Sequence, residues 1–167
     1  MADSSGALYG TTRSGGGASP CSISGNVGCG TVFKLEPRGK HYAEHILYRF
    51  HGADGALPYA GLVADAAGGL YGTTAQGGAH GYGAVFKLTP KSSNKYVENL
   101  LYSFGGYGTP DGNYPNAPLL IGADSSLYST TEYGGGTSLG FGTVFKLTPR
   151  GRGYAVFVPR MICGEPR

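Results

Sequence analysis

One short motif occurs three times in this chain of 167 residues, and it constrains the fold more than any other feature. The copies read "LYGTT", "LYGTT" and "LYSTT" and start 62 and 57 residues apart, at Leu8–Thr12, Leu70–Thr74 and Leu127–Thr131. Each copy is followed by a glycine-rich run and then by "TVFKL" or "AVFKL". A period of this size indicates a repeated supersecondary unit, and such units bury their apolar faces against their neighbours.

The middle unit contains four short segments with strand character, at residues 60–66, 69–75, 83–89 and 95–104. They are rich in aromatic and branched residues and are bounded by Gly, Pro, Asp or Asn, which is typical of strands. No segment shows the 3.6-residue apolar period of a helix. We therefore predict an all-β chain of three tandem four-stranded antiparallel units that resemble β-propeller blades. A solenoid of stacked hairpins or an open prism is the alternative.

Composition supports a folded chain with no obvious nucleic-acid partner. The 32 glycines and 10 prolines approach the level of low-complexity sequences. However, 40% of the residues are hydrophobic, with 13 tyrosines and 7 phenylalanines, and disordered chains lack such aromatic content. The net charge of +3 is too small to suggest nucleic acid, and no apolar run approaches the roughly 20 residues that span a membrane. The first ten residues do not read as a secretory signal.

The segments "GGLYGTTAQGGAHGYGAVFKLTP" and "LLYSFGGYGTPDGNYPNAPLL" give the chain a family resemblance. They resemble the GloVer-type tandem repeat of bacterial surface proteins, and the resemblance extends from Asp3 to about Ala155. It implies a β-propeller-like repeat in an exported, often surface-anchored protein, and therefore an extracellular or cell-surface location. The repeat carries no catalytic signature.

The repeat pattern divides the single domain into three units and a tail. Repeat 1 covers about 1–52, repeat 2 about 53–109 and repeat 3 about 110–158, and an irregular tail follows at 159–167. Met1 falls within the first-strand pattern, and the last-strand pattern is lost after Ala155, so we expect both outer units to be incomplete. Three blades are fewer than the roughly four to eight of closed propellers. We therefore expect an incomplete propeller, either a fragment or one that self-associates to complete a ring.

Ligand-binding candidates lie on loops at one end of the predicted sheets. Turns between second and third strands share that end with the links between units, and binding groups concentrate on loops. A glycan, peptide or protein ligand would meet aromatic, acidic and histidine side chains there. The candidates are Asp54, Tyr59, His80, Tyr82, Tyr107, Asp111, Tyr114, Tyr133 and Phe141.

The repeated motif itself is expected to be structural. Threonines in equivalent strands can form ladders, and tyrosines can wedge between blades. A ring of hydroxyls that binds sugar or peptide is the alternative. The residues concerned are Tyr9, Thr11, Thr12, Tyr71, Thr73, Thr74, Tyr128, Thr130 and Thr131.

Asp54 and Asp111 each precede a glycine in a link between units, which favours a tight turn held by the carboxylate. Calcium binding is the alternative, but it needs several oxygen ligands close together, and each link supplies one carboxylate. We therefore expect no metal and no cofactor.

Cys21 and Cys29 flank the longest loop and have no counterparts in the other repeats. They suggest a disulfide formed in an oxidising compartment, although two free thiols remain the alternative. Cys163 lies in the tail and has no evident partner within the chain.

Two functions are compatible with these features. The first is a non-enzymatic exported repeat that binds a ligand or protein or spaces other domains, because near-identical blades offer equivalent groups whereas catalysis needs non-equivalent ones. The second is a propeller-type carbohydrate-active enzyme with carboxylates such as Asp54, Asp111 or Glu132 as acid and base.

Overall fold

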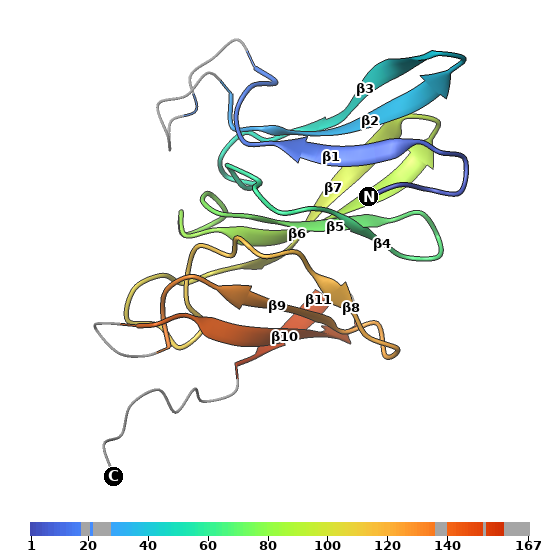
Figure 1. Ribbon diagram of the computed structural model, residues 1–167. Coiled ribbons are helices and arrows are strands. Elements are labelled where there is room, and N and C mark those ends of the chain that lie inside the picture. The colour runs from blue at the N-terminus through green and yellow to red at the C-terminus, as the bar shows by residue number, and fades with distance from the viewer. Residues whose placement is uncertain (18–20, 22–27, 136–139, 152, 159–167) are drawn as a thin grey trace.

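The computed structural model describes residues 1–17, 21, 28–135, 140–151 and 153–158. Within these ranges the chain is all-β and forms three separate antiparallel sheets, none of which closes into a barrel. The sheets stack one after another in sequence order, like consecutive propeller blades (Figure 1). The described residues contain no helix, and therefore none long and apolar enough to cross a membrane.

Each sheet is a meander in which consecutive strands pair. The first has the order β1-β2-β3, the second β4-β5-β6-β7 and the third β8-β9-β10-β11. The strands of the first sheet are β1 (Leu8–Thr12), β2 (Thr31–Arg38) and β3 (His41–Arg49). Those of the second are β4 (Val63–Ala64), β5 (Leu70–Thr74), β6 (Ala84–Ser92) and β7 (Lys95–Ser103). Those of the third are β8 (Leu120–Ile121), β9 (Leu127–Thr131), β10 (Thr143–Arg150) and β11 (Gly153–Phe157).

The outer units differ in how complete they are. In the first unit the place of the first strand is taken by an isolated bridge between Ala2 and Leu8. The third unit, which the sequence led us to expect incomplete, has all four strands. Its last strand continues past Ala155 to Phe157, although it has five residues where β3 and β7 each have nine. The predicted tail at 159–167, with Cys163, lies outside the described residues.

Two apolar cores lie between the sheets, and both are built around the same contact. Phe50 meets Phe86 edge-to-face with ring centroids 5.0 Å apart, and one repeat later Phe104 meets Phe145 at 5.1 Å. Three of these four rings, Phe86, Phe104 and Phe145, are fully buried. Because aromatic pairs favour this geometry, the repeat places one such pair at each junction between sheets.

The glycine of "LYGTT" has a packing reason. A Cβ built on Gly72 would lie 2.6 Å from the ring of Phe86, and one on Gly10 would lie 2.6 Å from the ring of Phe33. In the third unit Ser129 stands at this position and donates a hydrogen bond to the carbonyl oxygen of Ala117 at 3.1 Å.

The tyrosine of the motif contacts an acidic residue and a lysine of its own unit. The Tyr71 hydroxyl donates to Asp65 Oδ2 at 3.0 Å, Lys87 Nζ reaches the same oxygen at 2.9 Å, and the ammonium lies 4.7 Å from the ring centre of Tyr71. Burial, together with the Asp65 carboxylate, raises the pKa of Tyr71 to about 12. Tyr9 makes the same bond to Asp3, and Lys146 lies 5.2 Å from the ring centre of Tyr128.

The threonines of the motif connect strands and sheets. Thr11 Oγ1 donates to the carbonyl oxygen of Ala60 at 3.1 Å, and Thr73 Oγ1 donates to that of Ala117 at 3.2 Å, so each reaches the link that leads into the following sheet. The other threonines pair within a sheet, Thr12 with Thr31 and Thr131 with Thr143, both at 2.8 Å. Thr74 faces Ala84 instead, and its buried hydroxyl has no hydrogen-bond partner within the described ranges.

Candidate ligand-binding site

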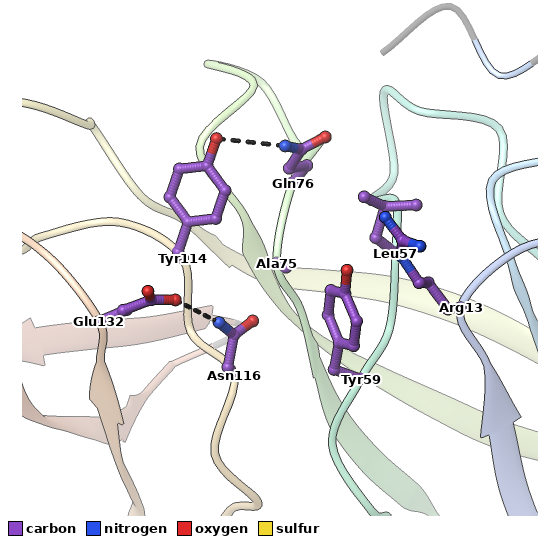
Figure 2. Close-up of a pocket in the computed structure, with 8 residues that line it drawn as sticks. All are labelled: Arg13, Leu57, Tyr59, Ala75, Gln76, Tyr114, Asn116 and Glu132. Atoms are coloured by element: carbon purple, nitrogen blue, oxygen red, sulfur yellow. Dashed lines mark hydrogen bonds between the residues drawn. The ribbon is translucent and has the colours of Figure 1, made fainter. Parts of the chain in front are cut away.

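A pocket of about 370 Å³ opens where the links between units meet the ends of the second strands. It draws on all three units: Arg13 follows β1, Gln76 follows β5 and Glu132 follows β9 (Figure 2). Ala75 also follows β5, and the links before β4 and β8 supply the other four residues. The full lining is Arg13, Leu57, Tyr59, Ala75, Gln76, Tyr114, Asn116 and Glu132.

Equivalent positions of the repeat line this pocket with different side chains. Arg13, Ala75 and Glu132 each directly follow the "TT" of the motif. In the two links, Leu57 corresponds to Tyr114 and Tyr59 to Asn116, as the flanking prolines show. The pocket is therefore asymmetric although the framework around it repeats.

The links hold Leu57 and Tyr114 in an unusual backbone conformation. Their φ angles are 55° and 53°, in the left-handed region that bulky residues seldom adopt and that is enriched at functional sites. Hydrogen bonds fix both residues: Leu57 N–H donates to the Cys29 carbonyl at 2.9 Å, and Tyr114 N–H donates to the Tyr82 carbonyl at 3.1 Å. The strained backbone thus carries two of the pocket side chains.

Polar contacts orient the lining. Gln76 Nε2 donates to the Tyr114 hydroxyl at 3.1 Å, and Asn116 Nδ2 donates to Glu132 Oε2 at 2.7 Å (Figure 2). Gln76 Oε1 is buried and has no hydrogen-bond partner among the residues that the structure describes. The Arg13 guanidinium lies 5.4 Å from the ring centre of Tyr59, whose side chain is half exposed. The pocket therefore combines aromatic surface with a cation, a carboxylate and two amides.

The structure brings four of the predicted aromatic candidates together. Tyr82 meets Tyr107 with ring centroids 5.7 Å apart, Tyr107 meets Tyr133 at 6.4 Å, and Tyr133 meets Tyr114 at 5.8 Å. This tyrosine cluster borders the pocket through Tyr114. Tyr107 and Tyr133 remain largely exposed, and a hydrogen bond to the Glu132 carboxylate raises the pKa of Tyr133.

His80 and Asp111 lie apart from this site. They line a separate pocket of about 490 Å³ with Thr109 and the end of the third sheet, including Val156. Asp111 Oδ2 accepts from the Tyr102 hydroxyl at 2.7 Å and from Gly105 N–H at 2.9 Å. Burial raises the pKa of Asp111, but hydrogen bonds from Thr109, Tyr102 and Gly105 outweigh it, so the net effect is to lower the pKa.

Asp54 holds its link as a turn in the same way. Its Oδ1 accepts from His51 N–H at 2.8 Å and its Oδ2 from the Tyr48 hydroxyl at 2.6 Å. The described residues contain no group of three or more His, Cys, Asp or Glu side chains placed to hold a metal ion. Phe141, the remaining candidate, is exposed and belongs to none of the pockets described above.

Cys21 and Cys29 form a disulfide with Cα atoms 5.0 Å apart. Because the Cys29 carbonyl accepts from Leu57, the disulfide anchors one wall of the pocket. Sequence reasoning did not select Arg13, Gln76 or Asn116 as ligand-binding candidates. The signal that reveals them is their position, next to repeated residues but different in each unit.

Comparison with known proteins identifies the repeat. No curated protein and no solved structure matches the chain. The family model of the Gloeobacter/Verrucomicrobia repeat matches residues 1–160, which is nearly the whole chain. The chain therefore belongs to the Gloeobacter/Verrucomicrobia repeat family.

Proposed function

We propose that this chain is a non-enzymatic, exported repeat module that binds a carbohydrate in the pocket formed by the three units. The observation that carries the proposal is the asymmetry of the lining. Arg13 and Glu132 occupy equivalent positions with opposite charge, and Tyr59 and Asn116 occupy equivalent positions with different chemistry. A repeat that serves only as a spacer has no need for such differences around one cavity.

The chemistry of the lining favours a sugar among the candidate ligands. Tyr59 offers an exposed ring to the apolar face of a sugar, and Gln76, Asn116 and Glu132 offer donors and acceptors to hydroxyl groups. The volume of about 370 Å³ lies at the small end of the range of roughly 300–1,000 Å³ for small-molecule sites. It suits one or two sugar rings better than an extended chain.

Two features support the non-enzymatic and exported parts of the proposal. The described lining holds one carboxylate, Glu132, whose Oε2 already accepts from Asn116, whereas glycoside hydrolysis uses a pair. The Cys21–Cys29 disulfide is of the kind that persists in oxidising compartments, which supports export. Accessibility of the native protein to a membrane-impermeant label on intact cells tests the location.

A glycan array probed with the purified chain tests the binding. We expect binding to a restricted set of glycans, and Tyr59→Ala should weaken it at least about fivefold, because truncating an aromatic anchor costs more than about 1 kcal/mol. Tyr42→Ala is the matched control, since Tyr42 is equally exposed but lies on β3, outside the lining. Failure to bind any glycan, or equal losses in both variants, would overturn the proposal.

A carbohydrate-active enzyme is the second candidate, and one pair of carboxyl groups favours it. Burial and the nearby Asp54 carboxylate raise the pKa of Glu98 to about 7, close to the value that a general acid needs at neutral pH. Hydrolysis of a glycan found on the array, lost in Glu98→Gln, would establish this function. Binding without turnover would leave the module non-enzymatic.

A further inference from the structure

The two ends of the stack leave unlike faces of the same repeated sheet uncovered. We call the face that each sheet turns toward the preceding sheet its leading face, and the opposite one its trailing face. In the middle sheet Leu70, Phe86 and Leu88 belong to the core shared with the first sheet and mark the leading face. Tyr71 and Val85 belong to the core shared with the third sheet and mark the trailing face.

The leading face of the first sheet is open. Its residues Leu8, Phe33 and Leu35 occupy the positions of Leu70, Phe86 and Leu88 in the register of their strand pairs. The three middle-sheet residues are at most 2% exposed, whereas Leu8 is 38% exposed and Phe33 and Leu35 are only half-buried. The same positions in the third sheet, Leu127, Phe145 and Leu147, are fully buried.

The trailing face of the third sheet is open as well. Val144 is 39% exposed, although its counterparts Val32 and Val85 are fully buried. Leu120 on β8 is 71% exposed. Its counterpart in the middle sheet is Val63, which packs against the core between the middle and third sheets. Thr130 is also exposed, whereas Thr11 and Thr73 donate hydrogen bonds to carbonyl oxygens in the links that lead into the next sheet.

We propose that a second copy of this chain docks head to tail, with the leading face of its first sheet on the trailing face of the third sheet. The chain itself carries the matching surface, because Leu8, Phe33 and Leu35 are the counterparts of the residues that pack with Val32 and Val85 in the two internal cores. The new interface therefore uses the same strand positions of the repeat as the internal ones. Docking at both ends joins six sheets, within the roughly four to eight of a closed propeller, so two chains close a ring.

Sedimentation velocity over a concentration series tests the proposal on the full chain. We expect a species of twice the 17.2 kDa chain mass, with no higher assemblies at moderate concentration. Val144→Asp and Leu8→Asp should each abolish this dimer, because each buries an unpaired charge in the interface. Val97→Asp is the control for a new surface charge, since Val97 is similarly exposed but lies on β7 of the middle sheet.

Mixing the two variants distinguishes head-to-tail docking from other arrangements. Chains with Leu8→Asp keep an intact trailing face and chains with Val144→Asp keep an intact leading face, so an equal mixture should form a weaker one-to-one complex. A dimer that survives Leu8→Asp alone would show two trailing faces meeting and would overturn the proposal. A wild-type chain that stays monomeric would overturn the proposal too. If a variant ending at residue 158 then formed a dimer, residues 159–167 would be identified as what covers the docking face in the wild-type chain.

Discussion

The middle sheet and the outer sheets are built from the same residues but differ in what covers them. Phe86 of the middle sheet is fully buried between two sheets, whereas Phe33, at the same place in the first sheet, is only half-buried. The sheets share the motif, the register and the strand order. The difference shows that a unit of this repeat gains much of its core from its neighbours, as expected of quasi-one-dimensional arrays.

The largest loss of stability should come from replacing the phenylalanine of "VFKL". Phe86→Ala should lower the free energy of unfolding by about 3–5 kcal/mol, because it leaves a cavity in a closed core. Phe33→Ala should cost about half as much, since its ring is partly in water already. Urea unfolding of both variants measures the difference, and equal losses would contradict the account of the end faces. Because docking would cover Phe33, the comparison requires protein concentrations at which the chain is monomeric.

The second largest loss of stability should come from removing the disulfide in the first unit, one of the two units with a single covered face. Replacing Cys21 and Cys29 together by serine should cost about 2.5 kcal/mol, the chain-entropy value for a loop of this size. The loss should also disturb the pocket, because Cys29 holds Leu57. Thermal unfolding and glycan affinity report the two effects, and wild-type values for both would show that the loop needs no covalent anchor.

The pH dependence of stability should distinguish a residue of the middle sheet from its counterpart in the first sheet. Glu98 on β7 has a pKa raised to about 7, so its folded pKa exceeds the ordinary value of 4.5, and stability should fall as pH rises from about 4.5 to about 7. Glu98→Gln should remove this fall and stabilise the chain by about 1 kcal/mol at pH 8, after allowance for solvent screening.

Glu44 is the matched control for this prediction. It holds the position of Glu98 in the register of the first sheet, opposite Leu35 as Glu98 is opposite Leu88, but it is exposed. Glu44→Gln should leave the pH profile of urea unfolding unchanged. If both variants shift the pH profile equally, the pH dependence does not arise from Glu98 at the boundary between the first and middle sheets.

The smallest predicted effect is a gain in stability, from a substitution in the middle sheet. Thr74 has a buried hydroxyl without a partner because Ala84 replaces the threonine found at this place in the outer sheets. Ala84→Thr should supply the missing bond and stabilise the chain by about 1 kcal/mol. Gly78 stands beside this site, as Gly16 and Gly135 stand beside Thr31 and Thr143, so the added methyl has room. Destabilisation by this variant would show that the units are not interchangeable.

The strands were largely predictable because each unit repeats its pattern and its turns. The first strand of the middle unit was overestimated: residues 60–66 were predicted, but β4 spans Val63–Ala64. The link residue Leu57 has a positive φ, and the proline that follows it cannot donate to a ladder, so regular pairing starts late.

The candidate site was predictable only in part. Tyr59 and Tyr114 stand out in sequence as aromatic residues on loops, and both line the pocket. Three polar residues of the pocket do not stand out in the sequence: Arg13, Gln76 and Asn116. Each is a single polar residue in a different unit, and only the stacking of the sheets brings the three together. The partnership of Asp65, Tyr71 and Lys87 was missed for the same reason, since it joins β5, β6 and a turn.

Mapping of backbone amide shifts by NMR tests the central claim most directly. The probe is a mixture of the methyl glycosides of glucose, galactose, mannose and N-acetylglucosamine, added to millimolar concentration. The account predicts saturating shifts that cluster at Arg13, Tyr59, Gln76, Asn116 and Glu132, with the turns at the other end of the sheets unchanged. Shifts that gather elsewhere, or no shifts at all, would contradict a sugar site built from the residues in which the three repeats differ.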